Sequence, residues 1–146
     1  MKRFMILVLS VVALTLILSG CGSGGGGGDT KSLTVTFHFQ ASNDGNSPIS
    51  GVKLGYTAPA PDTTQYTSPA SGSNGEFVVK LTKAGNYIVN TVYYGTNTYN
   101  LEDYDATFTV PVDQADITAN KKVMETVPID LSQSPPSIGE IVETTL

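Results

Sequence analysis

The chain of 146 residues is poor in the side chains that perform most enzyme chemistry. It contains one histidine, His38, one cysteine, Cys21, and no tryptophan. One histidine without a free thiol cannot make the usual zinc site, and a Ser-His-Asp triad would have to use His38. His38 occupies a polar position of an alternating segment, where a solvated strand histidine is the better interpretation. These shortages favour a non-enzymatic protein with no catalytic residues, no metal and no other cofactor.

Positive charge is also scarce. The chain has eight Lys and Arg residues against 13 Asp and Glu residues, and its only arginine is Arg3. Removal of the first 20 residues leaves six basic residues against 13 acidic ones, a net charge of −7. Phosphate groups are recognised by arginine forks and basic patches. We therefore expect neither nucleic acid nor an anionic lipid surface as a partner.

Long hydrophobic runs are absent except at the N-terminus. Lys2 and Arg3 precede an apolar segment, residues 4–17, that only Ser10 and Thr15 interrupt. This segment is shorter than the roughly 20 residues that span a bilayer. A short apolar run behind positive charges is typical of an export signal. The sequence therefore predicts a signal peptide over residues 1–20.

The export segment ends in Leu18-Ser19-Gly20-Cys21, which resembles the lipobox of bacterial lipoproteins. The resemblance implies cleavage before Cys21, a diacylglyceryl group on its thiol and an acyl chain such as palmitate on the new amine. Two or three buried acyl chains hold a protein firmly on a membrane. Gly22, in place of an aspartate, favours the outer membrane of the cell envelope. The alternatives are an ordinary cleaved signal with a free thiol and an uncleaved anchor.

Glycine dominates the next segment, residues 21–32, which includes the run Gly24 to Gly28. Such a composition predicts a flexible tether with a reach of roughly 15–20 Å. A phosphate-binding loop is the competing interpretation, but no strand precedes the glycines and no GK[ST] motif ends them.

Residues 33–131 have the pattern of a single β domain. Leu33 to Gln40 alternate strictly between apolar and polar side chains, as in a half-buried strand. Pro128 predicts an edge position for the last strand, and one helical turn fits within residues 113–122. About seven strands separated by turn residues predict an all-β, two-sheet sandwich of the Ig-like or transthyretin-like kind. Residues 132–146 contain Pro135-Pro136 and are expected to be a loose tail.

Three segments resemble carboxypeptidase regulatory-like domains. They are Pro48 to Leu54, Ser73 to Phe77, and Leu81 to Val89. The resemblance implies a transthyretin-like sandwich, of a kind often found on bacterial surface proteins and not catalytic in itself. The chain departs from the family pattern in having Ser-Gly-Val where Gly-Ala is usual, and in lacking a clear aspartate before Gly75.

Tyrosines provide the predicted binding surface. Four of them fall within 12 residues and are separated by Gly, Thr and Asn, namely Tyr93, Tyr94, Tyr99 and Tyr104. Rigid rings beside short polar groups make adaptable binding surfaces. The alternative is that some of these rings fill the core. Glu102, Asp103 and Asp105 also cluster, but solvated turn residues are a better interpretation than a calcium site.

These features predict a non-enzymatic envelope lipoprotein, anchored through lipidated Cys21, whose sandwich binds or braces another cell-surface component. That partner would be an envelope protein or a surface glycan. The alternative function is a surface-tethered carbohydrate-binding module. The absence of tryptophan weighs against that alternative, because sugar-stacking surfaces commonly use it. The tail around Ile138, Ile141 and Val142 could also supply a strand to a partner.

Overall fold

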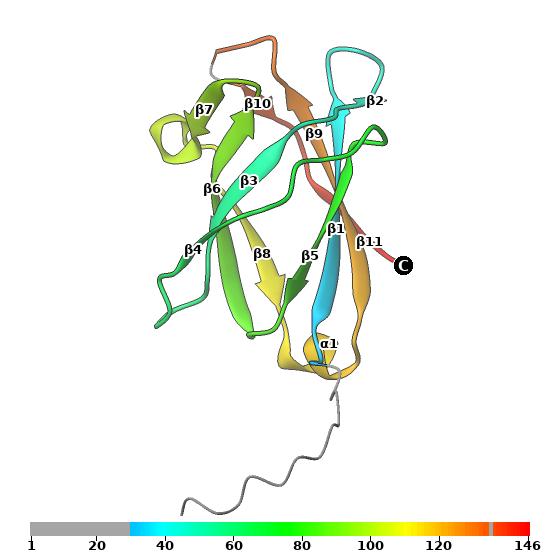
Figure 1. The fold of residues 1–146 in the computed structure, drawn as a ribbon, viewed down its shortest axis with the longest axis vertical. Helices are drawn as coiled ribbons and strands as arrows, with labels where there is room; N and C mark the ends of the chain where they lie inside the picture. Colours follow the sequence, from blue (N-terminus) through cyan, green and yellow to red (C-terminus); the bar gives the residue numbers. More distant parts are fainter. Residues whose placement is uncertain (1–29, 135) are drawn as a thin grey trace, which may run out of the picture.

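The computed structural model describes residues 30–134 and 136–146. The predicted signal peptide, Cys21 and most of the glycine-rich segment lie outside the described residues. The described chain forms two β-sheets packed face to face, with one short α-helix (Figure 1). The predicted two-sheet sandwich is therefore confirmed.

The first sheet is built around β1 and β9, which run parallel to each other. β2 and β5 pair with the other edge of β1, and β10 and β11 pair with the far edge of β9. The strands of this sheet are β1 (Leu33–Ala41), β2 (Ser47–Pro48), β5 (Glu76–Leu81), β9 (Lys122–Asp130), β10 (Ser137–Ile138) and β11 (Val142–Thr145).

The second sheet is centred on β6, which pairs with β3 on one edge and with β7 and β8 on the other. β4 is the short edge strand predicted from the surrounding prolines. The strands are β3 (Lys53–Thr57), β4 (Gln65–Thr67), β6 (Gly85–Tyr94), β7 (Asn97–Asn100) and β8 (Phe108–Val112). A 3-10 turn, η2 (Leu101–Tyr104), follows β7, and the helix α1 (Gln114–Thr118) occupies the expected position between β8 and β9.

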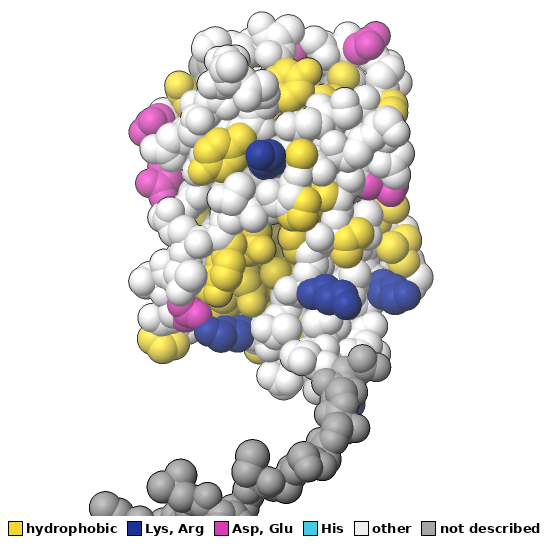
Figure 2. Space-filling view, in the orientation of Figure 1, with side chains coloured by type: hydrophobic (Ala, Val, Ile, Leu, Met, Phe, Trp, Pro, Cys, Tyr) yellow, Lys and Arg dark blue, Asp and Glu magenta, His cyan; other side chains and the backbone are white. Residues whose placement is uncertain are grey.

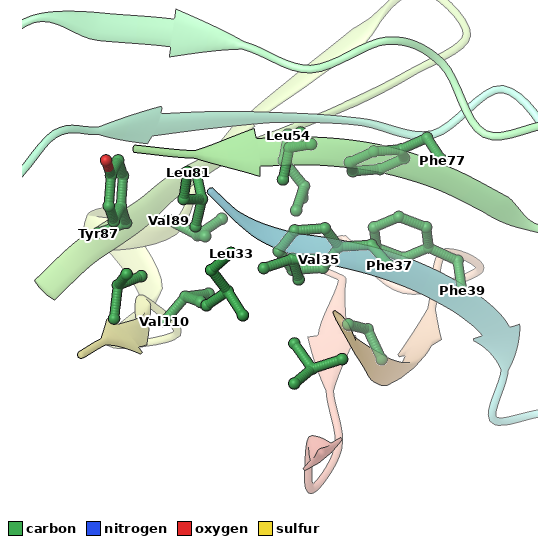
Figure 3. Packing of buried hydrophobic residues seen from close by; sticks show 14 of the residues in the cluster. Leu33, Val35, Phe37, Phe39, Leu54, Phe77, Leu81, Tyr87, Val89 and Val110 are labelled. Atoms are coloured by element: carbon green, nitrogen blue, oxygen red, sulfur yellow. The ribbon is translucent and has the colours of Figure 1, made fainter. Parts of the chain in front are cut away.

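The core lies between the two sheets and follows the alternation of β1. Leu33, Val35, Phe37 and Phe39 all point inward and are buried, while the intervening residues of β1 are half-buried on the outer face. The ring of Phe77 stacks on Phe37 and Phe39, with centroid distances of 5.2 and 5.6 Å (Figure 3). Burial of each such side chain stabilises the fold by about 1.5–3 kcal/mol. The aromatic residues of β1 and β5 thus form one end of the core.

The turn before β5 requires glycine. Gly75 has a φ of +77°, and a Cβ atom there would lie 2.6 Å from the carbonyl oxygen of Phe39. Most residues avoid this left-handed region, which glycine adopts freely. The predicted turn at Ser73-Asn74-Gly75 is therefore present, and it directs Phe77 into the core.

The C-terminal segment differs from its prediction. Residues 132–146 are not a loose tail, because β10 and β11 both pair antiparallel with β9. Pairing satisfies the N–H and C=O groups that β9 would otherwise leave open along this edge. The sandwich therefore extends to Thr145, and the described chain forms more strands than the seven or so predicted.

The position of β9 is also a correction, since Pro128 had indicated an edge strand. β9 is internal, with β1 on one side and the C-terminal strands on the other. On the C-terminal side, Pro128 falls between the paired positions Thr126 and Ile129, where the chain passes from β10 to β11. The Pro128 carbonyl oxygen accepts a hydrogen bond from the Gly139 N–H at 2.8 Å. The missing N–H of proline is therefore tolerated inside this sheet.

The N-terminal part of the described chain lies at the end of the sandwich that carries α1. The Ser32 N–H donates to Asn120 Oδ1 at 3.1 Å, and the Thr34 N–H donates to the Lys121 carbonyl at 2.9 Å. β1 begins there, whereas β2, β7 and β10 lie at the opposite end (Figure 1). Any tether before residue 30 therefore joins the sandwich at the α1 end.

Candidate functional site

The four predicted tyrosines do not share one surface. Tyr99 lies opposite Val92, which is buried, so Tyr94 and Tyr99 share the inner face and pack against the core. Tyr93 is half-buried on the outer face of the same strand. Tyr104, 45% exposed, ends η2. The structure thus places two of the rings on the inner face, partly buried against the core, and leaves the other two on separate surfaces.

The remaining sequence candidates occupy ordinary surface positions. His38 is half-buried on the outer face of β1, opposite Glu76 of β5. Glu102 and Asp103 are exposed in η2, and Asp105 follows as its left-handed cap. Within residues 30–134 and 136–146, no group of three His, Cys, Asp or Glu side chains is placed to hold a metal ion.

A groove of about 860 Å³ opens along one side of the sandwich. It lies between β8 of the second sheet and β10 and β11 of the first, and we call it the side groove. Apolar side chains on both walls include Phe108, Val110, Ile138 and Ile141. Tyr104, one of the predicted site residues, stands at its rim. The groove is therefore open to solvent while partly lined by core-forming strands.

Glu125 and Glu143 lie opposite each other in the side groove, and Asp105 is the third carboxyl group of its lining. Glu125 is on the inner face of β9 and is only 6% exposed. Glu143 of β11 is its direct partner across the antiparallel pair. Burial, and secondly the charge of Glu143, raise the pKa of Glu125. Like charges directly opposite each other in a sheet are destabilising, so this pair works against the stability of the fold.

The two carboxylates differ in their partners. Glu143 Oε1 lies 3.7 Å from Lys121 Nζ, which also contacts Asp116 Oδ2 at 3.3 Å. In the described part of the chain, no ion pair or side-chain hydrogen bond reaches the carboxylate of Glu125. Sequence reasoning missed Glu125, although a signal was present: it occupies an inward position of β9 between Val123 and Val127. A carboxylate inside an apolar alternation marks a candidate site.

The opposite side of the sandwich, between β4 and β5, is closed by tyrosines. Tyr56 stacks on Tyr66 at a centroid distance of 5.5 Å and lies 6.2 Å from Tyr87. Tyr87 is buried, and Tyr66 is 42% exposed. Figure 2 shows hydrophobic side chains gathered between β4 and β5 on this face. Burial is the main cause that raises the pKa values of Tyr56 and Tyr87.

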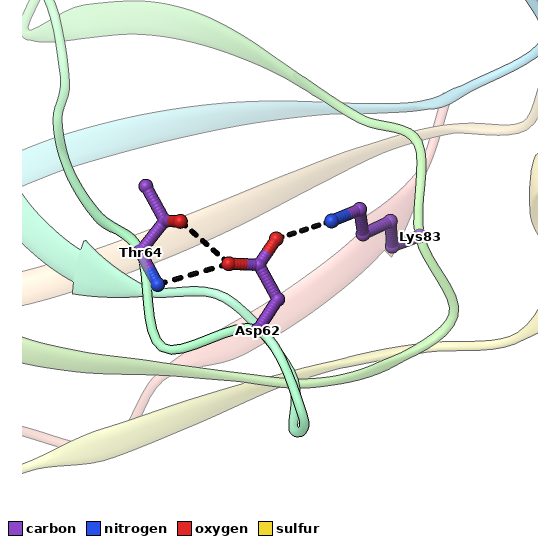
Figure 4. Close-up of polar contacts among 3 residues, drawn as sticks. All are labelled: Asp62, Thr64 and Lys83. Atoms are coloured by element: carbon purple, nitrogen blue, oxygen red, sulfur yellow. Dashed lines mark hydrogen bonds and ion pairs between the residues drawn. The ribbon is translucent and has the colours of Figure 1, made fainter.

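An ion pair borders the tyrosines. Lys83 Nζ donates to Asp62 Oδ2, and the Thr64 N–H donates to Asp62 Oδ1 at 3.0 Å (Figure 4). The hydrogen bonds from Lys83 and Thr64 lower the pKa of Asp62, and the same contact raises the pKa of Lys83. We call this region, with Tyr56, Tyr66 and Tyr87, the closed side.

The chain that crosses from β4 to β5 also belongs to the closed side. Ser71 Oγ accepts from the Val52 N–H at 3.0 Å and donates to the Ile49 carbonyl at 2.8 Å. Ser68 Oγ accepts from the Leu54 N–H at 2.9 Å. These buried hydroxyls continue the hydrogen bonding of β3 where Pro69 interrupts the regular ladder.

No protein-family model and no curated protein matches this sequence. Among the described residues, no helix combines the length and the apolar character needed to cross a membrane.

Proposed function

We propose that the chain is a non-enzymatic envelope lipoprotein, held on the membrane through lipidated Cys21, whose sandwich binds another envelope protein. The side groove is the proposed binding site. The observation that carries this proposal is Glu125, a residue only 6% exposed that lines an open groove and whose carboxylate has no partner among the described residues. Buried polar groups of folded proteins normally have a hydrogen-bond partner. A partner protein that covers the groove would supply one to Glu125, which would account for a glutamate at this position.

The anchoring half of the proposal rests on the resemblance of residues 1–21 to a lipoprotein signal with its lipobox. The domain joins its tether beside α1, so that end is nearer the membrane in this arrangement. The side groove then runs along the flank of the domain. With Gly22 after the lipidated cysteine, we propose the outer membrane as the location.

The carboxypeptidase regulatory-like resemblance is part of the same proposal. Two features of the fold support it: Gly75 occupies a left-handed turn, and Phe77 and Tyr87 are buried between the sheets. Domains of that family are not catalytic in themselves, which agrees with a binding role. Fold alone does not assign a function, so the binding site is argued from the groove.

Two experiments test the proposal. Cells that express the chain are fed a clickable palmitate analogue, and the label should appear on the wild type and vanish in Cys21→Ser. Amine-reactive cross-linking in whole cells, followed by mass spectrometry, should then recover one specific envelope protein linked through Lys121 or Lys122, since Lys121 contacts Glu143 of the side groove. An unlabelled wild type would overturn the anchor, and recovery of the chain alone would overturn the docking role.

The alternative function is a surface-tethered carbohydrate-binding module. The observation that favours it is the partly exposed ring of Tyr66 on the closed side, stacked on Tyr56. Aromatic faces stack on apolar faces of sugar rings. A glycan array probed with the purified chain tests this function: binding that is lost in Tyr66→Ala but kept in Glu125→Gln would favour the glycan over the protein partner.

A further inference from the structure

We infer that the side groove binds a lysine or arginine side chain carried on an extended segment of the partner protein, with Glu125 and Glu143 as the recognising pair. This inference rests on the proposed binding function and gives its ligand a chemical class. It follows from the burial of Glu125, the charge of the lining and the shape of the groove walls.

Glu125 lacks the partner that its position in the sandwich calls for. Glu125 as a whole residue is only 6% exposed, and a glutamate so placed normally has a hydrogen-bond donor or a cation beside its carboxylate. Glu125 has neither among the described residues, and its direct neighbour across the strands is another carboxylate. Any carboxylate oxygen of Glu125 that has no hydrogen-bond partner retains some solvent exposure. Because Glu125 lines the groove, a ligand in the groove can reach its carboxylate. A cation delivered through the groove would supply the missing partner.

The charge of the groove lining favours a cationic ligand. The ionisable carboxyl groups that line the groove are Asp105, Glu125 and Glu143, and no lysine, arginine or histidine is among the lining residues. The nearest described cation is Lys121, which reaches Glu143 from the α1 end and is shared with Asp116. The groove is thus an acidic surface with one sign of charge. Such a surface selects a cationic partner and repels an anionic one.

The groove walls suit a long side chain on an extended segment. Phe108 and Val110 on one wall, and Ile138 and Ile141 on the other, offer apolar surface to the methylene stem of a long cationic side chain. β8 pairs with β6 along one edge only, so its other edge faces the groove. An extended peptide can lie along such an edge and direct one side chain inward. Pro111 limits how far this edge could pair with a full strand.

The test is a fluorescence-anisotropy titration of the purified full-length mature protein in detergent. The probe is the fluorescein-labelled heptapeptide Ser-Val-Thr-Lys-Thr-Val-Ser, compared with the same peptide carrying norleucine in place of lysine. Loss of one partner of a buried charge pair is costly, so we expect norleucine to weaken binding by about tenfold or more. Glu125→Gln should weaken binding of the lysine peptide by a similar factor and make the two peptides alike.

The matched control is Glu102→Gln, which removes a carboxylate from exposed η2 outside the groove lining and should leave binding within twofold of wild type. Circular dichroism of each variant checks folding. Equal binding of both peptides, or equal losses in the two variants, would overturn the inference. Binding of free lysine amide as tightly as the peptide would overturn the extended-segment part. If the peptide titration fails but cross-linking in cells recovers a partner, the proposed function stands and only this inference is lost. If both experiments fail, the proposed function is overturned as well.

Discussion

The side groove and the closed side, at opposite edges of the sandwich, differ in the partners of their polar side chains. The closed side stacks tyrosine rings and pairs Asp62 with Lys83 and Thr64. The side groove places Glu125 opposite Glu143 and leaves Glu125 without a partner in the described chain. The first arrangement stabilises the fold, and the second works against it.

This difference distinguishes the side chains that stabilise the domain from those proposed to bind a partner. On the closed side, Tyr87, Asp62 and Ser71 are explained by packing or by a satisfied hydrogen bond. The acidic pair of the side groove has no such explanation, because glutamine or valine at residue 125 would serve the fold better. Residues that oppose stability concentrate at functional sites, which is why we propose binding at the groove and a packing role for the tyrosines.

The largest expected effect is on the closed side. Tyr87→Ala removes a ring that is 5% exposed and packed near Tyr56, and we expect a loss of about 3 kcal/mol in the free energy of unfolding. Tyr66→Ala, at a partly exposed ring, should cost about 1 kcal/mol or less. Urea unfolding followed by tyrosine fluorescence measures both. Equal losses at the two positions would contradict the assignment of Tyr87 to the core.

A smaller loss is expected from the chain that crosses the closed side. Ser71→Ala leaves the buried Val52 N–H without its acceptor, and the expected cost is about 1–2 kcal/mol. Ser73→Ala, in the exposed turn before Gly75, is the matched control and should change stability by less than about 0.5 kcal/mol. Urea unfolding compares the two variants. A Ser71 variant as stable as its control would show that this bridge contributes nothing.

A substitution in the side groove should raise the free energy of unfolding, not lower it. Glu125→Gln removes a charge held beside Glu143, so we expect the variant to be more stable than wild type by about 0.5–1 kcal/mol at pH 8. Because the folded state raises the pKa of Glu125, wild-type stability should fall as pH rises from the ordinary glutamate pKa through the raised one. The variant should lack this decline. Urea unfolding at pH 4 and pH 8 checks it, and a variant less stable at pH 8 would refute the idea of an unfavourable pair.

The smallest effect is expected at the exposed ion pair. Asp62→Asn should change stability little at pH 7, because the Asp62–Lys83 pair is solvent-exposed and screened by salt. The lowered pKa of Asp62 means that its contribution is present above the ordinary aspartate pKa and is lost as pH falls through the lowered one. Thermal unfolding at low and high salt measures the difference. A large loss that salt does not reduce would place this pair among the main stabilising contacts.

Much of the fold was predictable from alternation and turn residues. The apolar face of β1, the short edge strand β4, the turn at Gly75 and the helical turn at α1 all follow from local sequence. The strands β10 and β11 did not, because Gly139 and Glu140 interrupt them and Pro135-Pro136 precede them. Their pairing depends on β9, which is a tertiary partner.

The candidate site was less predictable than the fold. Composition singled out the tyrosine-rich stretch, yet strand register places Tyr94 and Tyr99 on the inner face, partly buried against the core. Glu125 could have been singled out from its inward position in β9. The pairing of Glu125 with Glu143 could not be predicted, because it depends on the register between β9 and β11, and the sequence pattern does not predict β11.

The most direct test of the account is site-specific photo-cross-linking in living cells. A benzophenone amino acid is placed at Thr109, on the exposed rim of the side groove, or at Thr82, on the exposed rim of the closed side. The account predicts a discrete adduct with one envelope protein from residue 109, reduced by Glu125→Gln, and none from residue 82. An adduct from residue 82 alone would contradict it and move the binding surface to the tyrosines.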